Sequence, residues 1–155
     1  MNMRKFALLA LLLVGLAGCA STSSPYGSFI QNTGAANGKT MADDVVKKLM
    51  ALYPPASTRF NLQHATPDAF GASLIESMRA KGYALLEFQP EPAGAAAPAP
   101  ATAVPTGMPL SYILDQAGDA DLYRVTLLIQ HQSLSRVYQI KDGMVYPAGY
   151  WIRKE

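Results

Sequence analysis

Two histidines and three aspartates come nearest, by type and spacing, to a site that could do chemistry. His64 and His131 each lie at the end of an expected strand. A zinc site needs three or four convergent ligands, and nothing at ligand spacing surrounds either histidine. Asp115, Asp119 and Asp121 fit a calcium loop poorly, because the Glu at the twelfth position and the required Gly are absent. We interpret them as a solvated β-turn and expect no metal site.

The sequence also lacks the short motifs of known catalytic folds. It contains no G-x-S-x-G elbow, no phosphate-binding glycine loop and no H-E-x-x-H. We therefore predict that the protein is not an enzyme, and that it uses no cofactor and no small-molecule substrate. The competing enzymatic hypothesis is a periplasmic hydrolase, which requires a cluster around His64 or His131.

The only cysteine, Cys19, follows an N-terminus that explains it. Two basic residues precede an apolar stretch from Phe6 to Leu16, and small residues lead from there to Cys19. This order is typical of a secretory signal, and the apolar core is shorter than the about 20 residues that a membrane span needs. We predict a signal peptide over residues 1–18.

The residues around the cleavage point resemble a bacterial lipobox, Leu16-Ala17-Gly18-Cys19. The resemblance implies diacylglycerol on the Cys19 thiol, cleavage before Cys19 and N-acylation of the new terminus, with acyl chains such as palmitate. Two or three chains anchor a protein stably, whereas one does not. Residue 20 is Ala, whereas Asp there would resemble an inner-membrane retention signal, so the analogy favours the outer membrane, facing the periplasm. The alternative is an ordinary signal peptide with an incidental or buried cysteine.

Composition sets the size and charge of the mature chain. The residues after position 18 suffice for one modest domain with its own core. The full chain has 13 basic and 11 acidic residues, and since the signal contains two of the basic ones, 11 remain against 11. No basic stripe suited to nucleic acid is present. No second cysteine is available for a disulfide.

Residues 19–39 are rich in Ser, Gly, Asn and Thr, which predicts a lipidated, flexible tether. Tyr26, Phe29 and Ile30 form a small apolar group within it. Either these side chains lie in disordered chain, or they form a short motif that docks in a partner's groove.

The domain is expected over residues 40–155 and to begin with a helix. Thr40 is the predicted N-cap, and Pro54-Pro55 ends the helix. On its surface we expect i, i+4 ion pairs of Asp43 with Lys47 and of Asp44 with Lys48. A second helix is predicted with Thr66 as N-cap, Pro67 at its first position (N1) and Gly82 just beyond its end.

Strands are expected over residues 58–63 and 83–88, and the C-terminal third reads as a β-meander. Within that meander, Asp142-Gly143 predicts a hairpin that pairs Ile140 with Val145. This pattern favours an α+β two-layer sandwich, with two helices packed on a mainly antiparallel sheet and some parallel pairing around the second helix. The Pro/Ala-rich segment at 89–107 cannot hold a helix or donate to a ladder. We interpret it as an insertion; the alternative is that it divides two small units.

The C-terminus gathers three aromatic residues, Tyr146, Tyr150 and Trp151. Either their rings belong to an edge strand and cover the core, or they form an aromatic patch that binds a partner. An exposed edge strand could also add to a partner's sheet.

Taken together, the chain resembles TrbH, a family of conjugal-transfer lipoproteins, over nearly its whole length. The lipobox, the tether "STSSPYGSFIQ" and the segments "MADDVVKKLMALYPPASTRF" and "GASLIESMRAKGYALLEF" carry the resemblance. It implies a part of the mating-pair-formation apparatus of a plasmid-type type IV secretion system, namely a small outer-membrane subunit of the core complex that helps seat larger subunits. It supplies no catalytic residue, and only Cys19 is carried over, as the lipid site.

Two hypotheses of different classes follow. The first is a lipid-anchored structural component whose partners are the membrane, through the lipid, and other secretion-channel subunits, without direct contact to nucleic acid. The second is a periplasmic envelope lipoprotein that binds peptidoglycan or a small ligand in a concave aromatic pocket.

Overall fold

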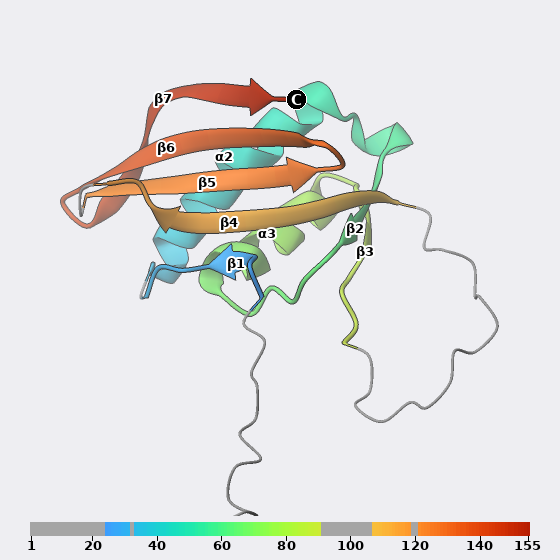
Figure 1. Cartoon of the computed structure of the whole chain (residues 1–155), viewed down its shortest axis with the longest axis horizontal. Coiled ribbons are helices and arrows are strands. Elements are labelled where there is room, and N and C mark those ends of the chain that lie inside the picture. Colours follow the sequence, from blue (N-terminus) through green and yellow to red (C-terminus); the bar gives the residue numbers. More distant parts are fainter. Residues whose placement is uncertain (1–23, 32, 91–106, 119–120) are drawn as a thin grey trace, which may run out of the picture.

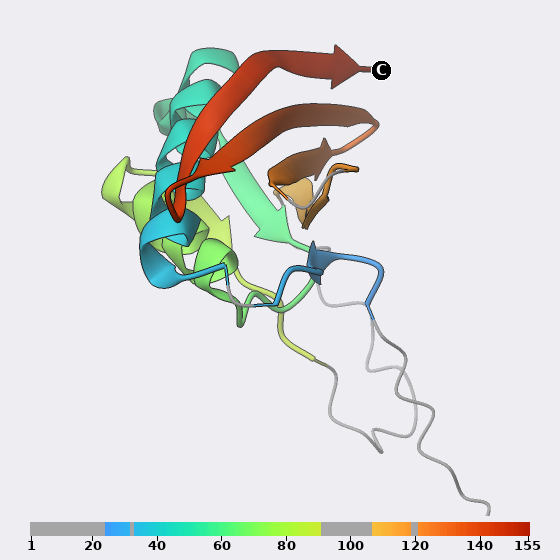
Figure 2. The ribbon, with the colours of Figure 1, turned by 90° about the vertical axis from the view of Figure 1, so that its left-hand side faces the viewer.

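The computed structural model describes residues 24–31, 33–90, 107–118 and 121–155, so the predicted signal peptide, Cys19 and most of the segment at 89–107 lie outside it. Within the described residues, two helices pack on one face of a seven-stranded mixed sheet (Figures 1 and 2), which confirms the predicted α+β class. The elements in chain order are β1 (Gly27–Ser28), α2 (Ala35–Leu52), the 3-10 helix η2 (Pro55–Ser57), β2 (Arg59–Leu62), α3 (Ala69–Ala80), β3 (Ala84–Leu86), β4 (Met108–Gln116), β5 (Leu122–Ile129), β6 (Gln132–Lys141) and β7 (Met144–Lys154).

Strand β4 joins the two halves of the sheet, whose order is β3-β2-β4-β5-β6-β7. One edge of β4 pairs with β5, and the other is shared: β2 pairs in parallel near Leu110, and β1 pairs in parallel near Leu114. β2 and β3 are also parallel, with α3 as the crossover between them. Strands β4 to β7 form an antiparallel meander. Both the meander and the parallel pairing around the second helix are confirmed.

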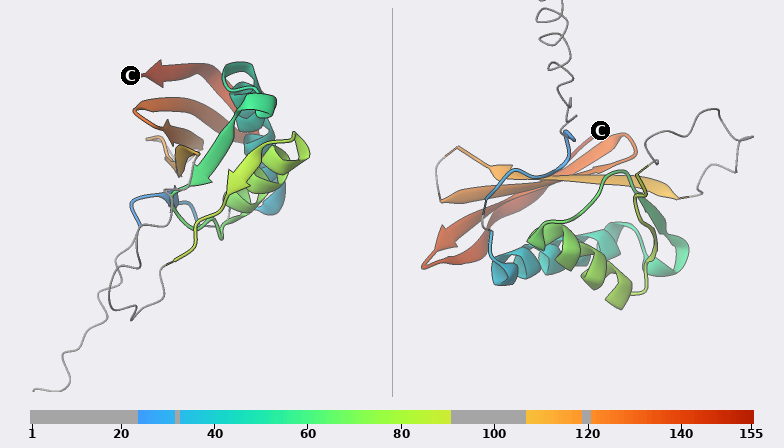
Figure 3. Two further views of the ribbon diagram at one scale, coloured as in Figure 1. Left: turned by 90° about the vertical axis from the view of Figure 1, so that its right-hand side faces the viewer. Right: turned by 90° about the horizontal axis from the view of Figure 1, so that it is seen from below.

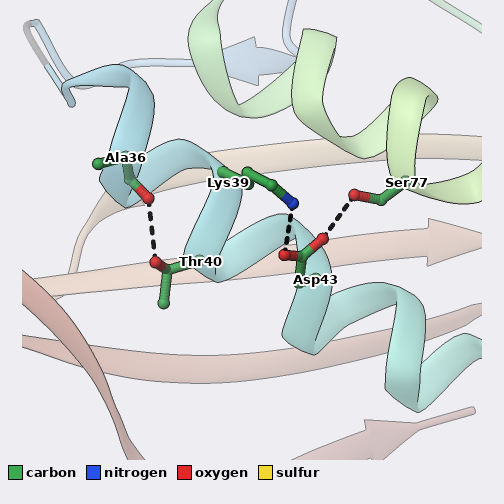
Figure 4. A network of polar contacts seen from close by, with 5 residues as sticks. All are labelled: Ala36, Lys39, Thr40, Asp43 and Ser77. Carbon is green, nitrogen blue, oxygen red and sulfur yellow. Dashed lines mark hydrogen bonds and ion pairs between the residues drawn. The ribbon is translucent and has the colours of Figure 1, made fainter.

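Helix α2 begins six residues earlier than predicted, at Ala35 after Gly34, whose φ is +69°. The prediction that Thr40 caps the helix is wrong. Its hydroxyl donates instead to the Ala36 carbonyl, one turn back inside the helix, at 3.0 Å (Figure 4). The helix ends at Leu52, as expected from the proline pair that follows.

Helix α3 is capped by Asp68 rather than by Thr66. The Asp68 carboxylate accepts from the Gly71 N–H at 3.0 Å, so the predicted cap is wrong by two residues. At the other end Gly82 has φ of +86°, and the Tyr83 N–H donates to the Met78 carbonyl at 3.1 Å. This closure by a left-handed glycine is the one that the sequence predicted.

The strand predictions hold with shorter limits, since the spans 58–63 and 83–88 reduce to β2 and β3. The hairpin between β6 and β7 is confirmed, with Ile140 paired to Val145. Asp142 and Gly143 both have positive φ, +53° and +75°. That combination is the one that a two-residue turn between twisted strands requires.

The core lies between the sheet and the helices, and its largest fully buried side chains include Phe60, Tyr112 and Tyr138. Side chains alternate along the strands. Leu127 and Leu134, which pair across β5 and β6, therefore point to the helices, and Thr126 and Ser135 point away. Among the described residues no element covers that second face, which we call the open face (Figures 2 and 3).

The segment before α2 lies on the domain from residue 27 onward. Gly27 and Ser28 pair with β4, and the Phe29 N–H donates to the Leu114 carbonyl at 2.8 Å. The predicted end of the tether at residue 39 is therefore too late. None of the helices in the described part of the chain has both the length and the hydrophobicity that crossing a membrane requires.

Helices α2 and α3 approach closely at Gly38, which allows a prediction. A Cβ at Gly38 would lie 2.9 Å from the Ala69 carbonyl carbon and 3.0 Å from the Phe70 nitrogen, both backbone atoms. We expect Gly38→Val to lower the free energy of unfolding by about 1–3 kcal/mol, because the helices must separate. Denaturant unfolding measures this loss of stability. Ala36→Val, at an exposed site of the same helix, is the control, and equal losses in both variants would contradict the packing argument.

Candidate functional site

Exposed apolar side chains gather on strand β7. Met144, Tyr146, Tyr150 and Ile152 are 55%, 47%, 92% and 57% exposed, and we call them the β7 row. Tyr146 pairs with Gln139 and Ile152 with Ser135, which places both on the open face of the sheet. Aromatic side chains exposed side by side are typical of surfaces that bind something.

The backbone of β7 is poorly suited to extend a sheet. Pro147 lacks an N–H, Gly149 has φ of +98°, and the pairing with β6 shifts in register between Ser135 and Val137. Proline and bulges are the devices with which natural edge strands resist pairing with other chains. The side chains of β7, rather than its backbone, are therefore the part available for binding.

Tyr150 and Trp151, which the sequence grouped together, have different surroundings. Tyr150 is almost fully exposed, whereas Trp151 is half-buried and packs against the core. The Arg136 guanidinium lies over the Trp151 ring at 5.9 Å from its centroid, a cation–π contact. Within the pair, only Tyr150 offers its whole ring to a partner.

Beneath Trp151, one carboxylate joins helix α2 to strand β6. Asp44 accepts from Arg136 Nη1 at 2.8 and 3.0 Å and from the Tyr138 hydroxyl at 2.8 Å. Burial and the neighbouring Asp44 carboxylate raise the pKa of Tyr138 well above its usual range, so the hydroxyl stays protonated and donates. The predicted pair of Asp44 with Lys48 is wrong, because the strand supplies a better-placed cation.

The N-terminal aromatic group lies at the other side of the sheet. Tyr26 stacks on His64 with ring centroids 5.6 Å apart, and Ile30 packs against the core. Phe29 remains 58% exposed. Four strand spacings separate β1 from β7, which is about 19 Å. The two aromatic groups that the sequence singled out therefore do not form one continuous site.

His64 is buried, and both of its ring nitrogens have partners. Nε2 accepts from the Tyr112 N–H at 3.2 Å, so Nδ1 carries the proton and donates to the Ala65 carbonyl at 2.9 Å. The Tyr112 hydroxyl in turn donates to Asp68. His131 is exposed in the turn between β5 and β6. In the described part of the chain, no three His, Cys, Asp or Glu side chains are grouped as metal ligands.

A groove of about 500 Å³ runs between the two helices on the side away from the sheet. Asp43 is one of its lining residues and accepts from Lys39 at 2.7 Å and from Ser77 at 2.6 Å (Figure 4); these hydrogen bonds lower its pKa. The predicted pair with Lys47 is wrong, since Lys39 takes that place. The sequence did not indicate this groove; its lining residues are Lys39, Asp43, Val46, Lys47, Met50, Ser77, Ala80 and Lys81.

The fold is that of a small α+β domain with exposed apolar side chains on its last strand, and comparison with known families identifies the domain further. The model of the family described as "Conjugal transfer protein TrbH" matches residues 23–155. The chain therefore belongs to the TrbH family of conjugal transfer proteins. No curated protein and no solved structure matches the chain.

The cluster around Asp44 yields a prediction about stability. Asp44 and Arg136 are each 20% exposed, so removing the carboxylate leaves a guanidinium largely buried without its partner. We expect Asp44→Ala to lower the free energy of unfolding by about 2–3 kcal/mol. Asp115→Ala, which breaks the more exposed pair with Arg124, is the matched control and costs less than about 1 kcal/mol. Equal losses in urea unfolding would show that burial does not matter here.

A second prediction concerns pH. Burial lowers the pKa of His64 below its ordinary value of 6.5, so the unfolded chain binds this proton more readily than the folded one. The stabilisation that neutral, buried His64 provides is complete above the ordinary pKa. It is lost as the pH falls through the lowered pKa of the folded state. We therefore expect the free energy of unfolding to decrease as the pH is lowered from above 6.5 through the pKa of the folded state.

Chemical unfolding at several pH values measures this loss. His64→Gln removes the dependence over that range, and the exposed His131→Gln retains it. A slope unchanged in His64→Gln would assign the pH dependence to other groups.

Proposed function

We propose that this TrbH-family protein is a lipid-anchored structural component of the mating-pair-formation apparatus in plasmid conjugation. In this proposal the acylated Cys19 holds the chain in the inner leaflet of the outer membrane, where the domain faces the periplasm and helps assemble or stabilise the core complex. Family membership is the observation that carries the proposal. The lipobox sequence supports the anchor, and no catalytic role is assigned to any residue.

The surfaces of the domain support a role in assembly. Phe29, on the segment before α2, is exposed to an extent that the domain's own core does not require. Aromatic residues of this kind dominate the binding energy of protein interfaces. A membrane anchor also concentrates the domain beside other membrane-held subunits, so that modest contacts suffice for assembly.

The groove between α2 and α3 favours a second candidate, an envelope lipoprotein that binds peptidoglycan or a small ligand. Its volume of about 500 Å³ falls within the range of small-molecule sites, about 300–1,000 Å³. Three lysines line it, which suits an anionic ligand. However, the Asp43 carboxylate also lines the groove, and no aromatic side chain of the described residues does, so the groove is not the concave aromatic pocket expected for this alternative.

Affinity purification from intact envelopes in mild detergent tests the proposal. We expect the tagged wild-type chain to bring down large secretion-channel subunits, and Cys19→Ser to lose them and to reduce DNA transfer, because the anchor no longer holds the domain beside its partners. Ala20→Asp separates the lipid from its location: it retains the acylated Cys19, and by the sorting analogy we expect it to stay membrane-bound but in the inner membrane. Normal transfer by Cys19→Ser would count against the anchor, and wild type recovered alone but retained on peptidoglycan would favour the ligand-binding candidate.

A further inference from the structure

The described chain begins close to the proposed lipid site. Residue 24 is five positions after Cys19, and five residues span at most about 18 Å even when fully extended. An acylated Cys19 therefore keeps the start of the domain within that distance of the membrane surface. The domain is wider than this connection is long, so it cannot sit far from the bilayer.

The direction in which the chain leaves the domain selects one face. The blue segment that begins at residue 24 leaves on the side away from the helices, in both side views (Figures 2 and 3). The same side carries the open face of the sheet. The helices and the groove between them lie on the opposite side.

The open face mixes apolar side chains with hydroxyl-bearing ones such as Thr126 and Ser135, as a surface at a phospholipid interface can. Ile113, Leu128 and Val137 are partly exposed on the sheet, and Tyr146 and Ile152 continue this apolar area onto β7. Charged groups on this face are few: Arg124 is paired with Asp115, and Lys141 and Lys154 lie at the ends of strands β6 and β7.

We propose that the open face of the sheet rests on the phospholipid surface next to the lipid anchor, with the β7 row inserted at the headgroup level. This inference rests on the lipid anchor of the proposed function. Tyrosine suits the interface because its ring is apolar and its hydroxyl is hydrated. Lysines at the rim extend their stems over apolar surface and keep their ammonium groups beside the phosphates.

Membrane contact accounts for the shape of the surface better than a protein partner does. The β7 row stands on a strand whose proline and register shift discourage pairing with another chain. The row is also spread along the strand rather than collected around a pocket. Because the acyl anchor already holds the domain beside the bilayer, the domain meets the membrane at a high effective concentration. A few exposed side chains are therefore enough to orient it. The groove between α2 and α3 then faces the periplasm.

Site-directed spin labelling of the full lipidated chain tests this orientation. The chain has one cysteine, and because its thiol is blocked in the lipidated form, an introduced cysteine provides the only free thiol. Tyr150→Cys and Met144→Cys place labels on the β7 row, at exposed sites that tolerate change. Ala72→Cys, exposed on α3, is the control on the helical side. Each variant is reconstituted in vesicles of phosphatidylethanolamine and phosphatidylglycerol without other proteins.

We expect labels at 150 and 144 to collide several-fold less often with a water-soluble nickel chelate, and more often with oxygen, than the label at 72. If the chain floats with the vesicles but all three labels are equally accessible to nickel, the proposed orientation is wrong although the lipid anchor is present. The β7 row would then bind a protein partner instead. If the chain does not float with the vesicles at all, the anchor itself fails, and the orientation fails with it.

Discussion

The double use of strand β4 is the constraint on which the rest of this structure depends. One of its edges carries the antiparallel meander, and the other is divided between β2 and β1. The residues before α2 and the C-terminal strands therefore belong to a single sheet. Tyr112 at the middle of β4 extends this connection into the core, where its ring meets those of His64 and Phe70 and its hydroxyl reaches the cap of α3.

Local chemistry explains why much of the fold could be predicted. Three features act over only a few residues and can be recognised in the sequence. They are the helical spacing of apolar residues, a glycine that accepts positive φ and the Asp142-Gly143 turn. The errors occurred where several local solutions compete. Thr40 can cap a helix or bond back to Ala36, and Thr66 lies only two residues from the better-placed Asp68. The pairing of β1 has no local signal, because its partner lies some 85 residues away along the chain.

The candidate site was less predictable for a related reason. The sequence marked Tyr150 and Trp151 as a unit, but neighbouring residues in an irregular strand meet different environments, one in solvent and one over Arg136. The pairing of Asp44 was assigned to the nearest lysine in the helix, whereas a guanidinium 92 residues away occupies the more enclosed position. The groove lined by Asp43 depends on the relative placement of two helices, which no pattern within either helix contains.

The shortness of β1 has a mechanical consequence. If the chain is held at Cys19 while its partners hold the domain elsewhere, tension enters through a ladder only two residues long, whereas β5 and β6 pair over eight. The short ladder gives way first, and the core between sheet and helices stays intact. Release of residues 24–34 up to α2 adds about 35 Å of extended chain. Residues 24–34 would then lengthen under tension, so that the two points of attachment could move apart without unfolding the domain.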